Sequence, residues 1–542
     1  MELSRLQAAI IDGYLDEPSC LGVPPYISPH VRYLYGALLT AGLKEDNIEY
    51  HTIDQLRKQR PKKLARLEEK NLVITIAGTT VPGNYLGGKP ISLTEIKKLG
   101  QQLSFPRKIL GGPITLIKKN IPGFDHLCSE IAAVDIFQLL TKNNIPKKQI
   151  PDYISHWAQA GAELTTRHPH HPYLVCELET FRGCPRSQHC HFCSEQLKTI
   201  TYQRQPEDII KEVRALATAG VHHFRLGCQT DLLLYGAKRK ADSWQPDPSV
   251  FQKLYSGIRE ADPQLKVLHL DNINPGTIAD YPHRSREILE IITRYNTPGD
   301  TAAFGLESAD TAVLEKNNIA TDPQKTMTAI KIMNQVGGKR KNGLPLLLPG
   351  LNFLHALKGE TPRTRKLNFS FLKKILNSGL LLRRINIRQV AAHNNYPRTA
   401  IDKYDFRSYK KKINREINQP LLKKVFPRGT ILKDVLTEEK KGQTTFGRQL
   451  GTYPILIGIP GRLPLTEFKN VRVIDHGYRS ITALPWPFRI KEATIEQLTA
   501  FPGIGDSKAG KIFVKQPSNK KELRQLLQPD FPFSEWEDWF VF

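Results

Sequence analysis

The sequence lacks any run of about 18 apolar residues, the length that a helix needs to cross a bilayer, so we expect no transmembrane helix. Its first residues, MELSRLQAAIIDGYLDEP, place acids soon after a very short apolar run, which is not the pattern of a signal peptide. Cysteine is also scarce, with seven residues in 542, three of them close together. This usage excludes a disulfide framework as the organising device and indicates a cytoplasmic protein.

Acidic residues are in short supply. Asp and Glu number 53 against 78 Lys and Arg, a net charge of +25, and the isoelectric point is near 9.6. The positive electrostatic field that this charge creates favours nucleic acid as a partner. The alternative is that the charge serves solubility or reflects a basic proteome.

A chain of 542 residues is too long for a single core, so we expect about three or four domains of α/β class. Residues 1–160 alternate apolar strands with helix patterns, which predicts a doubly wound, Rossmann-like parallel sheet. Ligands bind such sheets at the carboxyl ends of the strands. The strands are expected at Ala8–Ile11, Tyr50–Ile53, Leu72–Ala77 and Lys108–Gly112, a helix at Pro29–Gly42, and ligand loops at Gly78–Gly88 and Gly111–Pro113.

Residues 157–172 contain HPHHP, and prolines break its spacing, so we interpret it as a linker. His168, His170 and His171 are the metal-binding alternative within it. Residues 172–400 then repeat strand and helix about six times, which predicts a partial (β/α)6 barrel with its site at the strand carboxyl ends. Polar residues expected there are Gln229, Asp231, Asp271, Asn274, Glu307, Ser308, Arg388 and Gln389.

The stretch TFRGCPRSQHCHFCSE gathers Cys184, Cys190 and Cys193 on one short loop. Three thiolates so close together are ligands for zinc or for an iron–sulfur cluster. Zinc would need a fourth ligand, which His189 or His191 offers. A [4Fe–4S] cluster held by three cysteines would instead keep one iron free for another ligand.

This loop resembles that of the radical S-adenosylmethionine (radical SAM) superfamily, with Phe192 before the last cysteine and a first gap of five residues where three are usual. FGLESAD at 304–310 and NFLHALKGET at 352–361 resemble segments of methylthiotransferases and their cobalamin-type cousins. The resemblance implies a [4Fe–4S] cluster on the three cysteines and SAM on its open iron, with reductive cleavage giving a 5′-deoxyadenosyl radical. It also implies cofactor contacts at Phe192, Gly227, Gln229, Glu307, Ser308, Asn352 and Glu360, and a catalytic role for Arg388.

Residues 1–160 resemble the cobalamin-binding-like domain of many radical SAM proteins, including the strand end KILGGP. They lack the D-x-H-x-x-G signature that supplies a lower ligand to cobalt. Several relatives lack it too, so cobalamin stays a possible cofactor, and a domain of this shape that binds nothing is the alternative.

The last 140 residues resemble nucleic-acid-binding modules. We expect a basic connector at 401–442 with the cationic run Lys410–Lys412, then at 443–492 a small β-barrel like the RNA-binding TRAM barrel. Residues 493–542 resemble a helix-hairpin-helix with a tail that packs on the barrel, in which Asp506 or Ser507 caps the second helix. The backbone-binding residues are then Gly503, Gly505, Ser507, Lys508 and Lys511.

Nearly the full length resembles archaeal-type radical SAM proteins that end in a helix-hairpin-helix. The first hypothesis is therefore an enzyme that methylates or methylthiolates a base in tRNA or rRNA, with electrons from a ferredoxin or flavodoxin. Methylthiolation needs a second cluster, and only Cys20, Cys128 and Cys176 precede the loop, so methylation ranks higher. The alternatives are a radical SAM enzyme acting on a small molecule or a protein side chain, and a non-catalytic zinc protein that binds nucleic acid.

Overall fold

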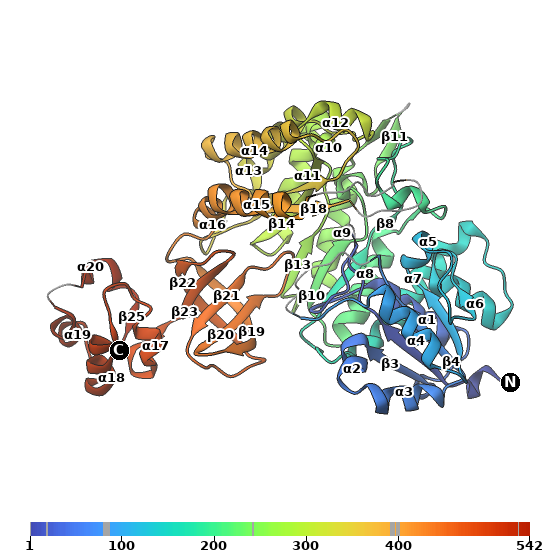
Figure 1. The fold of residues 1–542 in the computed structure, drawn as a ribbon, viewed down its shortest axis with the longest axis horizontal. Coiled ribbons are helices and arrows are strands. Elements are labelled where there is room, and N and C mark those ends of the chain that lie inside the picture. The colour runs from blue at the N-terminus through green and yellow to red at the C-terminus, as the bar shows by residue number, and fades with distance from the viewer. Residues whose placement is uncertain are drawn as a thin grey trace.

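A computed structural model describes residues 2–17, 20–79, 87–240, 243–390, 396, 402–528 and 531–542. In chain order it contains a sheet domain, a central barrel, a small closed barrel and a C-terminal helical unit (Figure 1). Most of the ligand loop expected at 78–88 lies outside the described residues. No described helix combines the length and the apolar character that crossing a bilayer requires.

The N-terminal domain is built on a parallel sheet, as the sequence predicts, and its strand order is β3-β1-β4-β5-β6. Every side chain of β1 and β4 is buried, because helices cover both faces. Ile10 and Ile74 pack against α1, α6 and α7, while Ile11 and Val73 pack under α2, α3 and α4. The strands are β1 (Ala8–Asp12), β3 (Ile48–Thr52), β4 (Leu72–Ile76), β5 (Arg107–Gly111) and β6 (His126–Leu127). The helices are α1 (Pro29–Thr40), α2 (Ile53–Lys58), α3 (Arg60–Glu68), α4 (Leu93–Gln102), α6 (Ala132–Thr141) and α7 (Ile150–Ala160).

The segment interpreted as a linker at 157–172 is packed structure instead. Trp157 lies in the last turn of helix α7 and is 0% exposed, and Leu164 and His168, which follow the helix, are also buried. Two glycines allow this packing: a Cβ on Gly36 would meet the Trp157 carbonyl oxygen at 2.2 Å, and one on Gly161 the Arg32 oxygen at 2.0 Å. The linker prediction was wrong because the HPHHP segment forms a turn, and the apolar residues that precede it pack into the core.

The central barrel has six parallel strands, which confirms the partial barrel that the sequence predicts. Its two sheets meet where Ala303 donates its amide to the Asp271 carbonyl at 2.8 Å. At one edge β2 (Tyr26–Ile27), a piece of the N-terminal chain, pairs with β7. The strands are β7 (Val175–Glu179), β10 (His223–Gly227), β13 (Val267–Leu270), β14 (Asp300–Glu307), β17 (Leu347–His355) and β18 (Arg384–Gln389).

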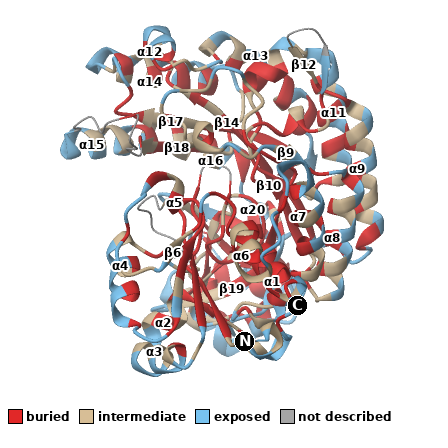
Figure 2. Ribbon diagram, turned by 90° about the vertical axis from the view of Figure 1, so that its right-hand side faces the viewer, coloured by how far each residue is buried: buried red, intermediate tan, exposed pale blue. Residues whose placement is uncertain are grey.

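Helices cover the outside of this barrel, with buried sides toward the strands and exposed sides outward (Figure 2). They are α8 (Pro206–Thr218), α9 (Pro248–Ala261), α11 (Pro282–Tyr295), α13 (Pro323–Gly337) and α14 (Pro362–Asn377). The carboxyl ends of the six strands form the mouth of the barrel. Polar residues predicted from the sequence lie at this mouth, among them Asp231, Asp271 and Glu307.

The small barrel is closed, in the order β19-β20-β21-β23-β22. Its strands are β19 (Ile431–Lys441), β20 (Thr444–Gln449), β21 (Leu456–Pro460), β22 (Phe468–His476) and β23 (Ser480–Pro485). The first strand lies within residues 401–442, which the sequence reading assigned to a basic connector. That connector is helical where described before the barrel, with α15 (Lys403–Ile413) and α16 (Gln419–Val425).

The C-terminal unit contains α17 (Ile495–Leu498), α18 (Asp506–Lys515) and α19 (Lys520–Leu527). Gly505 is the residue that caps α18, without a side-chain hydrogen bond, so the expected caps Asp506 and Ser507 lie inside the helix. The aromatic tail packs against the barrel, because Trp536 and Trp539 share a buried cluster with Ile474 and Leu484 of β22 and β23. β25 (Phe540–Val541) pairs with β24 (Phe488–Arg489), which follows the barrel. In addition, Arg472 of β22 forms an ion pair with Asp538 at 2.7 Å.

Candidate functional site

The cysteine loop follows β7 at the mouth of the central barrel. Gly183 begins it at φ +94°, and a Cβ there would meet Thr201 at 2.5 Å, so only glycine fits. The loop is pinned by the segment after α12 (Thr311–Lys316): His191 donates its amide to the Asn317 oxygen at 3.0 Å, and Asn318 donates its side-chain amide to the His189 oxygen at 2.9 Å. This anchoring holds the three cysteines at the cavity described below.

Cys184, Cys190 and Cys193 are half-buried thiols. Burial raises the pKa of each of them, so the thiolate forms need a positive partner. Arg186 gives part of that charge, with its guanidinium 3.2 Å from the Cys190 sulfur. A bound iron cluster supplies the rest, because metal coordination deprotonates a thiol outright.

The spacing of the sulfurs distinguishes zinc from a cluster. Thiolates around one zinc ion lie about 3.8 Å apart, as a Zn–S bond of about 2.3 Å in a tetrahedron requires. In the part of the chain that the structure describes, only His126, Cys128 and Asp135 bring three such ligand atoms within 4.8 Å of one another. The loop cysteines are therefore spread more widely, as when each binds a different iron of a cube. The donor set fits a [4Fe–4S] cluster and disfavours the zinc alternative with His189 or His191.

One large cavity of about 1190 Å³ opens beside these cysteines. It lies between the N-terminal domain, the mouth of the central barrel and the small barrel, and each of the three contributes lining residues. Among the residues proposed from sequence, it is lined by Cys184, Cys190, Phe192, Cys193, Asp231, Asp271, Asn274, Glu307, Asn352, Arg388 and Gln389.

Glu307 and Arg388 are two charged residues of this lining, at the ends of β14 and β18. Burial raises the pKa of Glu307 to about 8, and the Arg388 guanidinium opposes the shift. Glu307 has φ +64°, and its carboxylate folds over Gly305, where a Cβ would meet it at 2.8 Å. One of its carboxylate oxygens is buried without a hydrogen-bond partner, which leaves it available to a ligand.

Two of the expected SAM contacts, Gly227 at the end of β10 and Gln229 just after it, are not among the residues that line the cavity. Gln229 is fully buried, accepts from the Thr180 hydroxyl at 3.3 Å and donates to the Leu226 oxygen at 3.2 Å. Gly227 has its side-chain space filled by Glu177, whose carboxylate would lie 1.8 Å from a Cβ. Both residues therefore shape the barrel core.

Ser308 and Glu360 are likewise outside the lining. The Ser308 hydroxyl accepts from the Asp310 amide at 3.1 Å. Glu360 accepts from the Ala356 amide and from His355 Nδ1, both at 2.6 Å. These two side chains brace the loops after β14 and β17, and the structure does not bring them to the cavity.

Sequence reasoning missed an arginine at the centre of the site. Arg225 is fully buried, with its guanidinium 5.4 Å from the ring centres of Tyr26 and of Tyr453. It pairs with Asp271 and, at 3.1 Å, with Glu177. Its partners come from the N-terminal chain, the central barrel and the small barrel, so no local sequence pattern could predict this group of side chains.

Asp16 and Glu17, just after β1, were also missed, and both line the cavity. Burial raises the pKa of Asp16, with Arg388 opposing, and raises that of Glu17 to about 7. Their position in the sequence could have identified them, because they follow the first strand of a doubly wound sheet, where ligands bind.

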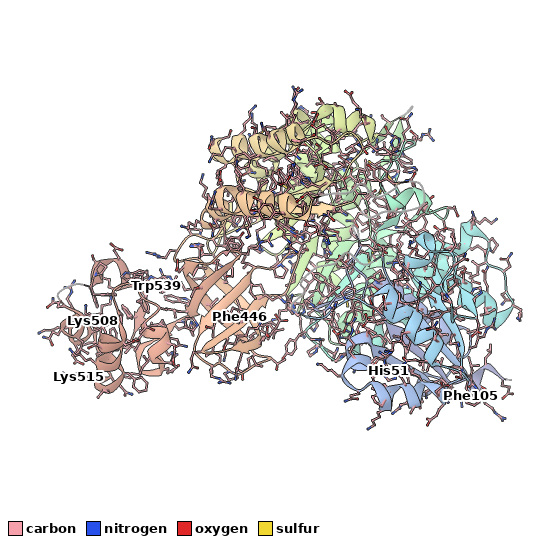
Figure 3. The ribbon with its side chains drawn as sticks, viewed as in Figure 1. His51, Phe105, Phe446, Lys508, Lys515 and Trp539 are labelled. Carbon is pink, nitrogen blue, oxygen red and sulfur yellow. The ribbon has the colours of Figure 1, made fainter. Side chains whose placement is uncertain are left out.

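The nucleic-acid residues proposed from sequence lie on a different part of the molecule. Gly503 has φ +91° in the turn between α17 and α18, and Ser507 and Lys511 are exposed. Figure 3 labels Lys508 and Lys515 at the end of the molecule far from His51 and Phe105 of the N-terminal domain. The structure therefore brings Gly503, Gly505, Ser507, Lys508 and Lys511 together, but away from the cysteine loop.

Comparison with known proteins gives a family and relatives. The model of the radical SAM superfamily matches residues 178–358. An uncharacterized protein of Archaeoglobus fulgidus is 40% identical over 527 residues, covering 94% of this chain and 96% of its own. The uncharacterized protein MJ0274 of Methanocaldococcus jannaschii is 39% identical over 508 residues, covering 88% and 92%. A solved structure of the radical SAM methyltransferase TsrM from Kitasatospora setae has a TM-score of 0.46 at 15% identity, covering 73% of this chain and 77% of that one.

Proposed function

The chain belongs to the radical SAM superfamily, and from that premise we propose that it methylates a base in a structured RNA such as tRNA or rRNA. When bound, the cluster supplies the electron that splits SAM into methionine and a 5′-deoxyadenosyl radical. Cys184, Cys190 and Cys193 hold the cluster at the barrel mouth, and a ferredoxin or flavodoxin is the electron donor.

The lining of the cavity suggests what each side chain does. Glu307 and Asn352, at the ends of neighbouring strands, offer acceptors to the hydroxyl and amino groups of SAM. Arg388 offers a cation to a carboxylate or a base oxygen, and Phe192, on the cysteine loop, would give the cluster an apolar neighbour. Enclosure by three domains excludes water, which protects a radical from side reactions.

The main support for an RNA substrate is that the small barrel forms part of this same cavity. Lys441, Arg448 and Leu456 of β19, β20 and β21 line it together with the cysteine loop. In Figure 1 the small barrel lies between the central barrel and the C-terminal unit. An RNA held by the basic connector and the α18 lysines would thus reach the cavity along one side, with a flipped base inside.

Methylation is favoured over methylthiolation by the remaining cysteines. Cys20, Cys128, Cys176 and Cys228 are all buried. Among the described residues, Cys128 lies with His126 and Asp135, while Cys20 lies beside Cys228. Because methylthiolation needs a second cluster on three of these cysteines, we rank methylation above it.

Cobalamin is the methyl carrier that this proposal includes. The N-terminal wall of the cavity offers an apolar surface for a corrin ring through Leu21, Val23, Pro24 and Ile117. Among the described residues of that domain, no histidine lines the cavity, in keeping with the absent D-x-H-x-x-G pattern. Hydroxocobalamin added to anaerobic protein should therefore bind without a histidine ligand, which its absorption spectrum reports.

The test of the RNA function is nucleoside mass spectrometry. RNA from a strain that lacks the gene is compared with wild-type RNA, and the proposal expects one methylated nucleoside to disappear. Purified enzyme with SAM and a strong reductant should then restore it on the RNA of the deletion strain. Unchanged nucleosides, together with methylation of a small molecule or a protein in cell extract, would replace the RNA substrate by the alternative class.

A further inference from the structure

Asp16 occupies a fixed position in the wall of the cavity. Its backbone forms an antiparallel bridge with Leu21, and beside it Gly22 donates to the Leu15 oxygen at 2.6 Å. Its side chain is 0% exposed, and Asp16 is among the residues that line the cavity. Both of its carboxylate oxygens are without a hydrogen-bond partner.

A buried carboxylate without donors is costly, so it calls for an explanation. Asp12, four residues earlier, shows what the fold does with a structural one. It is equally buried, and its two oxygens accept from the Tyr14 amide at 2.9 Å and from the Tyr50 hydroxyl at 2.7 Å. The fold thus gives Asp12 hydrogen-bond donors and gives Asp16 none, which indicates that the donors for Asp16 arrive with a ligand.

The group beside Asp16 narrows the chemistry of that ligand. Arg388 Nη2 lies 3.9 Å from Asp16 Oδ1, too long for a hydrogen bond and close enough for one planar ligand to meet both residues. The two carboxylate oxygens of Asp16 are adjacent hydrogen-bond acceptors, and the guanidinium of Arg388 beside them is a donor. A ligand that matches this pair presents two adjacent N–H groups and then an oxygen on one edge.

Among the four RNA bases, guanine alone has that edge, with its N2 amine and N1–H next to O6. Adenine and cytosine offer one donor beside an acceptor, and uracil has its single N–H between two oxygens. Enzymes that act on a flipped base read this edge inside the pocket. Resting on the proposed function above, we propose that Asp16 and Arg388 select guanine as the base that this enzyme modifies.

The nucleoside comparison tests this choice separately from the function itself. If the nucleoside lost from RNA of the deletion strain is a guanosine derivative, the inference stands. If it derives from adenosine, cytidine or uridine, the inference is overturned while the RNA function survives. If no nucleoside is lost, the function fails first.

A variant gives the second test, with the full-length enzyme and a transcript of the RNA region that carries the lost nucleoside. Asp16→Asn keeps the shape but replaces one acceptor by a donor, so kcat/KM for methylation should fall about 100-fold. Reductive SAM cleavage without RNA should stay within twofold, and so should cobalamin binding. Asp12→Asn, buried on the same strand end and outside the cavity, is the matched control and should keep methylation.

Inosine in place of the target guanosine removes only the N2 amine. It should lower kcat/KM about 10-fold with the wild-type enzyme and have no further effect with Asp16→Asn, since the amine no longer has its acceptor. A merely structural role for Asp16 would leave the inosine effect equal in both enzymes, and that result would overturn the inference. Loss of SAM cleavage or of cobalamin in Asp16→Asn would also overturn it, because the carboxylate would then serve a cofactor.

Discussion

Tyr453 of the small barrel donates its hydroxyl proton to Asp271 of the central barrel at 2.7 Å. Its ring stacks under Arg384, whose guanidinium lies 3.8 Å from the ring centre. Next to it, Thr452 donates its amide to His269 at 2.8 Å, and Tyr26 donates to the Gly451 oxygen. The loop between β20 and β21 thus joins the small barrel to the other two domains, directly beside the cavity.

We expect this loop to fix the small barrel in place. Tyr453→Phe removes one hydrogen bond and should cost about 1 kcal/mol of stability. Tyr453→Ala also removes the ring between two guanidinium groups, and at a half-buried site it should cost about 2 to 3 kcal/mol. Chemical denaturation measures both changes, and limited proteolysis of Tyr453→Ala should release the small barrel first. Equal stability of the two variants would contradict the role of the ring.

Arg186 should tune the iron cluster, because its guanidinium lies 3.2 Å from the Cys190 sulfur. A cation stabilises the reduced, more negative cluster, so Arg186→Met should lower the midpoint potential by on the order of 50 mV. A redox titration followed by electron paramagnetic resonance gives the value. Arg186→Lys keeps the charge and should shift the potential less. A higher potential in Arg186→Met would contradict the electrostatic argument.

The lysines of α18 should contribute to RNA affinity through phosphate contacts. Replacing Lys508, Lys511 and Lys515 by alanine should weaken binding and make the slope of log K against log salt shallower by about two. The control replaces Lys62, Lys97 and Lys98, which are exposed on α3 and α4 of the N-terminal domain. Filter binding of tRNA between low and moderate salt measures the slopes. Equal slopes for the two triple variants would remove α18 from the RNA site.

Asp300 should make stability depend on pH. It accepts from the Leu270 amide at 3.2 Å, from Asn296 at 2.6 Å and from the Thr301 amide at 2.7 Å, and burial still raises its pKa to about 8. The folded state therefore binds this proton more tightly than the unfolded state, so its stabilising contribution is complete below about pH 4. It is lost as pH rises to about 8, by at most about 1.4 kcal/mol per pH unit.

Asp300→Asn has no such proton, so it isolates the effect. Between pH 5 and pH 8 the urea midpoint of the wild type should fall relative to that of the variant, and above pH 8 the difference should level off. Nearby His269, 3.7 Å from Asp300, does not interfere, since burial lowers its pKa to about 3. A difference that stays constant with pH would contradict the burial argument.

Local patterns predicted the regular elements well. The apolar runs around Ile10, Ile74 and Ile109 are buried parallel strands, and the helix expected at Pro29–Gly42 ends at Thr40, two residues early. The small barrel was placed too late, because β19 reads as a charged run, ILKDVLTEEKK, of which a two-residue alternation is only partly visible. Its bulge between Leu432 and Val435 interrupts that alternation.

The cavity was predictable only where one loop or strand end carries the chemistry. The predictable lining residues include Cys184, Cys190, Cys193 and Glu307. Arg225 and Tyr453 were not predictable, because the contacts that give them their roles come from other domains. Gln229 shows the reverse error: it follows a barrel strand, but a left-handed Cys228 at φ +61° precedes it and its side chain lies in the core.

The central claim is that three cysteines hold a cluster that cleaves SAM. The direct measurement is iron content and 5′-deoxyadenosine formation by anaerobically purified protein with SAM and dithionite. The account predicts about four irons per chain and reductive cleavage for the wild type and for the control Cys128→Ser, and loss of both in Cys184→Ala, Cys190→Ala and Cys193→Ala. Wild-type protein that binds no iron and leaves SAM intact would contradict it.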